Sequence, residues 1–170
     1  MSVAAPLPGD IGLYRIPGIG GLAIAVGQML LGDGFKSKTH VFIVCADGQV
    51  FAAQPGPKGA RYDPLENYPG SVFTTGPVDP TQEQRDQILI ECERLLGTPY
   101  SWLDYLSLAC HHFGIRPKRI EDYIKDSGHM ICSQLGDEVY KRVGIHLFSD
   151  GRLEQDVTPG DIDLAYGEAK

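Results

Sequence analysis

The sequence has no excess of positive charge. Its 170 residues include 15 lysines and arginines against 22 aspartates and glutamates, which gives a formal net charge of −7. Proteins that bind nucleic acids neutralise backbone phosphates with clustered basic side chains. We therefore expect no nucleic-acid partner for this chain.

A long uninterrupted apolar run is also missing. The most apolar stretch, residues 16–32, is interrupted by Pro17 and five glycines and is shorter than the roughly 20 residues that span a bilayer. We expect a short helix packed on the core at 21–31, and no membrane partner. Residues 1–10 lack the basic start and the apolar segment of a secretory signal, which predicts a protein that is cytoplasmic at synthesis.

Paired cysteines are absent as well. The sequence has four cysteines, Cys45, Cys92, Cys110 and Cys132. They show no CxxC or other paired spacing, so we expect reduced thiols. One group of nearby side chains suggests zinc: Cys110, His111, His112 and His129. Because adjacent helical residues point about 100° apart and no HxxxH spacing is present, we expect no metal and no cofactor.

Segments typical of strands come first in the chain, and helical patterns follow. A strand is expected at 9–16, a hairpin at 39–45 and 49–54, and a looser strand at 70–75. Helices are expected at 79–97, with Asp79 or Thr81 as the N-cap, and at 101–114, 118–126 and 132–143. Residues 158–166 are interpreted as a strand or an extended tail. This order predicts an α+β fold, with an antiparallel sheet and helices packed on one side, in a single domain over residues 1–170.

Cys132 is the cysteine whose position suggests chemistry. It follows a glycine-containing turn and begins an amphipathic helix. The N–H groups and the positive dipole end at a helix start stabilise a thiolate. His40 begins an apolar strand, and histidine is the usual proton acceptor for such a thiol. The alternatives from the residues alone are a strand-edge histidine and a helix-capping thiol.

Four segments together resemble a known family. They are PGDIGLYR at 8–15, THVFIVCADGQVFAAQPG at 39–56, LGTPYSWLDYLSL at 96–108 and MICSQLGDEVYKRVGI at 130–145. Their order is similar to that in the circularly permuted branch of the NlpC-type papain-like superfamily, which includes YiiX-like hydrolases and lecithin–retinol acyltransferase-like enzymes. The resemblance implies a papain-like fold, with Cys132 as nucleophile, His40 as its base and Tyr100 as a substrate-binding tyrosine.

The sequence departs from this family at the third catalytic position. The residue that orients the histidine usually lies a dozen positions after it, and Ala52 occupies that place. Gln54 shares a strand face with Ala52 because strand side chains alternate. A two-residue loop at Asp47-Gly48 turns Gln54 away from His40. A three-residue loop, with Gly48 at positive φ, pairs the two directly, and we favour this second form.

The resemblance implies an amide hydrolase that works through an acyl-enzyme, with peptidoglycan peptides as its substrate. A lipid acyltransferase or thioesterase on the same residues is one alternative. A catalytically weak structural module is another, and Ala52 favours it. If the chain comes from a bacteriophage, virion or tail assembly partners are expected, and the protein is then virion-associated.

Overall fold

The computed structural model describes the chain in nine stretches, residues 5–18, 21–22, 24–25, 29, 38–54, 57–74, 79–100, 130–151 and 157–166. A five-stranded sheet with the order β4-β3-β2-β1-β5 forms its centre, and every neighbouring pair is antiparallel. The strands are β1 (Ile11–Tyr14), β2 (His40–Val44), β3 (Gln49–Ala53), β4 (Ala60–Pro64) and β5 (Val72–Thr74).

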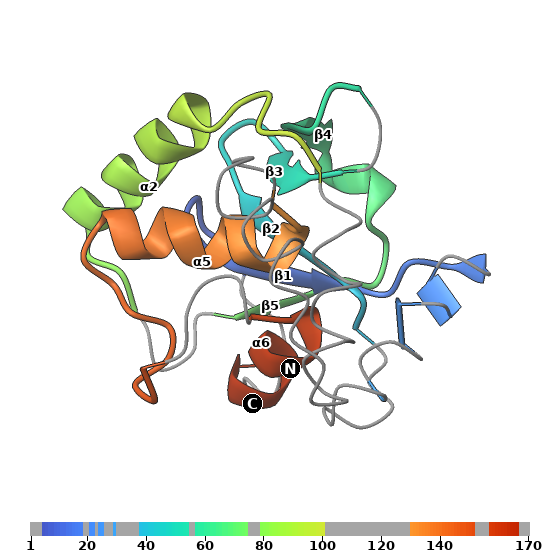
Figure 1. Cartoon of the computed structure of the whole chain (residues 1–170). Coiled ribbons are helices and arrows are strands. Elements are labelled where there is room, and N and C mark those ends of the chain that lie inside the picture. Colours follow the sequence, from blue (N-terminus) through green and yellow to red (C-terminus); the bar gives the residue numbers. More distant parts are fainter. Residues whose placement is uncertain are drawn as a thin grey trace.

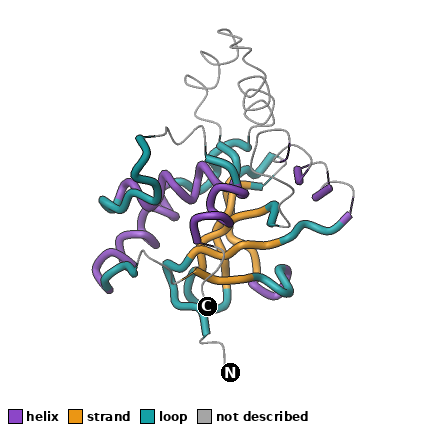
Figure 2. Tube along the Cα trace, turned by 90° about the horizontal axis from the view of Figure 1, so that it is seen from below, coloured by secondary structure: helices purple, strands orange, loops and turns teal. Residues whose placement is uncertain are grey.

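Three α-helices of the described residues contribute to the core on one face of this sheet. They are α2 (Gln82–Arg94), α5 (Cys132–Arg142) and α6 (Pro159–Tyr166). Helix α5 packs directly on β2 and β3, and α2 runs beside α5 (Figures 1 and 2). The predicted α+β class, an antiparallel sheet with helices on one side, is confirmed.

The sheet has apolar side chains on both faces. Val41 and Ile43 of β2 belong to the large cluster between the sheet and the helices, whereas Phe42 and Val44 belong to a smaller cluster on the other face. The smaller cluster is possible because Gly12 of β1 carries no side chain. A Cβ at Gly12 would lie 2.0 Å from the Phe42 ring, so glycine there lets the ring lie flat on the sheet.

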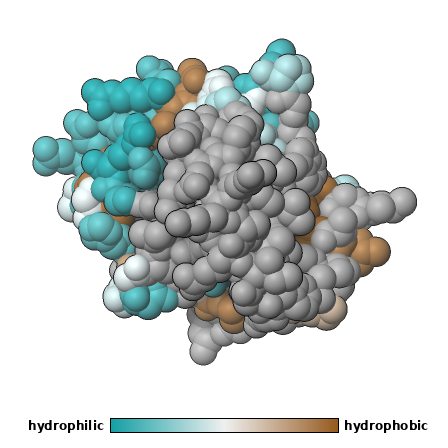
Figure 3. All heavy atoms as spheres, viewed as in Figure 1, coloured by the Kyte–Doolittle hydropathy of each residue, from teal (hydrophilic) through white to brown (hydrophobic). Residues whose placement is uncertain are grey.

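The exposed side of α2 is polar, as the hydrophilic surface over this helix in Figure 3 shows. Thr81 is the N-cap, and the side chains of Thr81 and Gln84 each accept a hydrogen bond from the other residue's backbone N–H. This capping box decides between the two predicted N-caps in favour of Thr81.

The β2–β3 hairpin combines features of both predicted loops. Asp47 and Gly48 both have positive φ, at 57° and 68°, as in a two-residue type I′ turn. The pairs Ile43–Phe51 and Val44–Val50, however, follow the register of a three-residue loop. Cys45 and Ala46 both hydrogen-bond to Gln49, so one extra residue is accommodated as a bulge. The predicted register and the positive φ of Gly48 are confirmed, but the conformation of Asp47 was not predicted.

The C-terminal segment corrects the prediction of a strand or tail at 158–166. Residues Pro159–Tyr166 form α6. Thr158 and Asp161 form reciprocal side-chain to backbone hydrogen bonds of 2.9 and 3.0 Å at its start. Proline suits the first helical position because its missing N–H has no partner there in any helix. The sequence signals interpreted as a turn were therefore those of a helix start.

Strand β4 was not predicted, and the helices predicted at 101–114 and 118–126 lie outside the described residues. The same is true of Cys110, His111, His112 and His129, and of most of the predicted helix at 21–31. Within the described part of the chain, no helix is long and apolar enough to span a membrane.

Candidate active site

Cys132 is the first residue of α5 and is only 2% exposed. Leu135 and Val139 follow on the same helical face and are also buried, so this face packs against the sheet. Ile131, at the N-cap, donates its backbone N–H to the Gln134 side chain at 3.0 Å. The helix has no acidic residue in its first turn and two basic residues in its last. This charge distribution complements the helix dipole and favours an anion at its start.

His40 is the first residue of β2 and is 5% exposed. Its ring lies on the sheet face away from α5, where the centroid is 6.5 Å from that of Phe42 and 5.7 Å from that of Tyr68. The Tyr68 and His40 rings are stacked, with 13° between their planes. No described residue forms a hydrogen bond with the imidazole, which is unusual for a buried polar group.

Cys132 and His40 lie at the same end of two packed elements. A Cβ placed on Gly136 would lie 3.5 Å from Val41 Cγ1, so α5 contacts β2 one residue after His40. Cys132 precedes Gly136 by about one helical turn and lies on the same helical face. Both β2 and α5 begin on the same side of the molecule (Figure 1).

The two side chains nevertheless lie on different sides of the sheet. Cys132 lies on the side that the helices cover, and the His40 ring lies on the other side. Val41 faces α5, and its neighbour His40 faces away because strand side chains alternate. For a hydrogen bond between Cys132 and His40, the imidazole has to reach around the beginning of β2. The Cys132–His40 pair therefore stays a prediction.

A set of polar side chains is connected by hydrogen bonds around the Tyr68 hydroxyl group. We call it the Tyr68 network, and it consists of Gln54, Arg61, Asp63 and Tyr68. The Gln54 side-chain N–H group donates to both Asp63 and Tyr68, and Arg61 donates to the Gln54 carbonyl oxygen at 2.5 Å. The Tyr68 hydroxyl also donates to Asp63 Oδ2 at 3.0 Å.

Gln54 is placed on the predicted side of the sheet. If the observed β2–β3 register is continued, residue 54 lies opposite residue 40. The Gln54 amide oxygen accepts a hydrogen bond from Arg61, and its nitrogen donates to Tyr68. Gln54 is thus connected to His40 through the stacked Tyr68 ring. Its role as the third catalytic residue stays a prediction.

Sequence reasoning missed Tyr68, Asp63 and Arg61. Arg61 and Asp63 alternate with Tyr62 on β4, so they share a face with Ala52 of the neighbouring strand. Their alternation after Gly59 was a signal that a strand with one polar face begins there. Tyr68 follows the short 3₁₀-helix η1 (Leu65–Asn67), and no local pattern connects it to His40.

Tyr100, the predicted substrate-binding residue, lies close to the start of α5. It forms a parallel bridge with Met130, and Met130 donates its backbone N–H to Pro99 at 3.0 Å. Met130 is two residues before Cys132, so the structure brings the chain around Tyr100 to the predicted nucleophile. Whether Tyr100 contacts substrate stays a prediction.

Burial lowers the pKa of His40 from 6.5 to about 4. The negative charge of Asp63 opposes this shift, and the positive charge of Arg61 adds to it. The burial effect dominates because the imidazolium form has lost its contact with water. His40 is therefore neutral at pH 7, with a lone pair that can accept a proton.

Acid should destabilise the protein through His40. The unfolded chain binds this proton near pH 6.5 and the folded chain only near pH 4. The stability due to neutral His40 is therefore complete above pH 6.5 and is lost as the pH falls through this window, by about 3 kcal/mol. Urea unfolding at pH 7 and pH 4 measures the loss, which should be smaller in His40→Gln.

His146 provides the matched control for this measurement, because its side chain is exposed to solvent. The His146→Gln variant should keep the wild-type loss of stability. An equal pH dependence in His40→Gln and wild type would show that the imidazole is not shielded from water.

The described fold is α+β with an antiparallel sheet, consistent with the fold of a YiiX-like protein. Among solved structures, the chain is similar to that of the metalloprotein yiiX from Escherichia coli O157:H7, with a TM-score of 0.59. The alignment covers 96% of this chain and 84% of that one at 16% sequence identity, which shows a shared fold. No protein-family model and no curated protein sequence matches the chain. The finer assignment to the permuted NlpC-type branch stays a prediction.

Proposed function

We propose that this protein is a cysteine hydrolase that cleaves an amide bond through an acyl-enzyme. His40 accepts the proton of the Cys132 thiol, and the sulfur then forms a bond with the substrate carbonyl carbon. The carbonyl electron pair moves onto oxygen, which the N–H groups at the start of α5 stabilise. The intermediate expels the amine, which takes the proton from His40. Water then releases the acyl group as a carboxylic acid and restores the thiol.

The observation that carries this proposal is the burial of His40 near the start of α5. Its side chain is 5% exposed, and burial lowers its pKa to about 4, so the imidazole is neutral at pH 7 and can accept a proton. Titratable groups with strongly shifted pKa values cluster at functional sites. The nearby start of α5 provides a cysteine in an environment that stabilises a thiolate.

The surroundings of His40 suit a neutral base. In some cysteine enzymes the resting state is a thiolate–imidazolium pair, which needs a histidine pKa well above that of the thiol. The pKa of His40 is lowered instead, so the resting imidazole is neutral, and a thiolate at Cys132 depends on the helix start for its stabilisation. Stacking on Tyr68 restricts rotation of the imidazole, and the Tyr68 network in turn holds the tyrosine.

Peptidoglycan peptides are the substrates that we propose first, because of the four sequence segments that resemble NlpC-type enzymes. The similarity to yiiX concerns the fold and leaves the bond open. The YiiX-like fold is compatible with a hydrolase, and the amide and the peptide are our proposal.

Iodoacetamide at pH 6 should modify Cys132 before any other cysteine in the folded protein. Exposure alone predicts the opposite order, since Cys45 is 8% exposed and Cys132 only 2%. Cys92 is fully buried, and its hydrogen bond with Cys45 raises the pKa of the Cys92 thiol further. Faster reaction at Cys132 must therefore come from thiolate stabilisation at the helix start. Peptide mass spectrometry of time points measures each site.

The Cys132→Ala variant is the control, and its remaining thiols should react at their wild-type rates. Faster labelling of Cys45 than of Cys132 would contradict an activated nucleophile. That result would favour the alternative of a catalytically weak module.

A further inference from the structure

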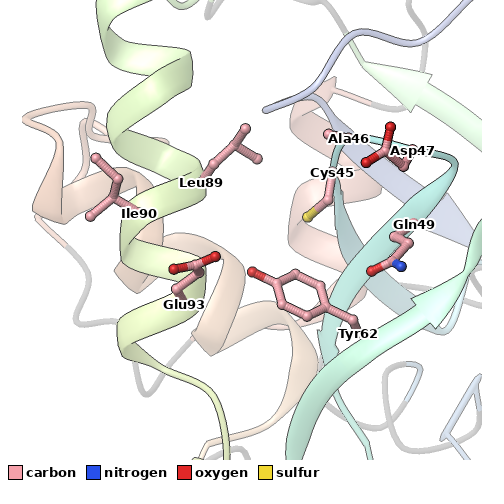
Figure 4. A pocket seen from close by; sticks show the side chains of 8 residues that line it. All are labelled: Cys45, Ala46, Asp47, Gln49, Tyr62, Leu89, Ile90 and Glu93. Carbon is pink, nitrogen blue, oxygen red and sulfur yellow. The ribbon is translucent and has the colours of Figure 1, made fainter.

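A concave site lies at the opposite end of β2 from His40. We call it the hairpin groove, because the β2–β3 turn forms one wall and α2 the other, with Tyr62 of β4 between them (Figure 4). Its volume is about 310 Å³, at the lower end of the range for small-molecule sites. Cys45 follows the last residue of β2, so the groove is roughly 17 Å along the strand from His40.

The charge in the hairpin groove has one sign. Asp47 lies on the turn side and Glu93 on the α2 side, and none of the described residues that line the groove is a lysine, arginine or histidine. Neither carboxylate forms an ion pair within the described residues. By contrast, the partly buried Glu138 forms an ion pair with Arg142 at 2.7 Å.

The rest of the lining is apolar or aromatic. Leu89 and Ile90 line the helix wall, and Ile90 is 42% exposed. The Cys45 side chain points into the space between α2 and Tyr62, while its thiol donates to the Ile43 carbonyl at 3.6 Å. The Tyr62 ring is held by the Phe51 ring at 5.6 Å.

The Tyr62 hydroxyl points across the groove toward Glu93 (Figure 4). Burial is the main cause that raises the pKa of Tyr62 to about 12, with smaller contributions from Cys45, Cys92 and Glu93. The phenol therefore keeps its proton at physiological pH and remains a neutral hydrogen-bonding group. An uncharged phenol ring also attracts cations to its face.

We propose that the hairpin groove binds a small aliphatic amine, a primary ammonium group on a short alkyl chain. The ammonium group lies between Asp47 and Glu93, which neutralise it from opposite walls. The alkyl chain covers Leu89 and Ile90, and this contact removes exposed apolar surface from water. The Tyr62 ring provides a further contact for the cation.

The test uses the full chain and 1-aminopentane, a single ammonium group on a five-carbon chain, as the probe. Titration followed by methyl NMR should shift the signals of Leu89 and Ile90, with a dissociation constant in the low millimolar range or below. The Glu93→Gln variant keeps size and hydrogen bonding but removes one charge, so the dissociation constant should rise about fivefold or more. Bound amine should also slow alkylation of Cys45 at pH 8.5 and leave Cys132 unaffected.

Two controls distinguish binding through charge from binding through hydrophobic contact alone. Glu83 is an exposed acid in the first turn of α2 and outside the groove, so Glu83→Gln should bind the amine as wild type does. 1-Pentanol has the same chain without charge and should bind at least about fivefold more weakly. Equal binding of amine and alcohol, or an unchanged constant in Glu93→Gln, would overturn the proposal. Because Cys132 is not involved, either result leaves the hydrolase proposal untouched.

Discussion

Cys132→Ala should lower the rate of amide cleavage by at least about 10³-fold, because alanine has no group that can form the acyl-enzyme. The His40→Ala variant should show a loss of similar size, since the two residues act on one proton and their effects do not add. The measurement is the release of new amino termini from purified peptidoglycan, followed with an amine-reactive dye.

The matched control for this loss is Cys45→Ala, which removes a thiol of similar burial from the opposite end of β2. It should keep most of the wild-type rate. Urea unfolding of each variant shows whether the fold survives the substitution. A folded Cys132→Ala protein with half of the wild-type rate would disprove the acyl-enzyme mechanism.

Arg85→Met should lower the free energy of unfolding by about 3–5 kcal/mol. Arg85 donates to Asp10 at 2.7 Å, and the two side chains are only 7% and 1% exposed. Arg85 also donates to the Pro8 carbonyl at 2.9 Å, so it fastens the segment before β1 to α2. Methionine retains the volume of arginine but leaves the Asp10 carboxylate buried without its cation.

The control for this ion pair is Arg94→Met, also on α2. Arg94 pairs with Glu91, but its side chain is 65% exposed, and ion pairs of that kind contribute at most about 1 kcal/mol. Urea midpoints of both variants give the comparison. A loss in Arg85→Met no larger than that in Arg94→Met would show that the buried pair adds little. The double variant Asp10→Asn/Arg85→Met should recover part of the stability, since it removes the unpaired charge.

The sequence predicts the elements whose patterns are local. The β2–β3 hairpin alternates apolar side chains around a turn that contains glycine, and α5 repeats apolar residues at helical spacing up to Gly144. Both lie within one or two residues of the predicted bounds. His40 and Cys132 were singled out for the same reason, because each begins such an element.

The missed elements depend on partners distant in the sequence. The edge strand β4 carries Arg61 and Asp63 on one face and ends at Pro64, so its composition resembles that of a loop. Its polar face is explained only when Gln54 and Tyr68 are placed beside it. Helix α6 was missed for a local reason, since Thr158 and Pro159 suit a turn as well as a helix start.

The bulge at Cys45 and Ala46 has a consequence for the register of the hairpin. It adds one residue to a turn that otherwise needs two, and strand side chains repeat every two residues. Without the bulge, at the same chain length, Ala46 would pair with Gln49 across a regular two-residue turn, and β3 would shift by one position against β2. Phe51 would then exchange faces with Ala52, and residue 54 would point toward α5 instead of toward Tyr68. The surroundings of the buried imidazole thus depend on one unpaired residue in a turn at the far end of both strands.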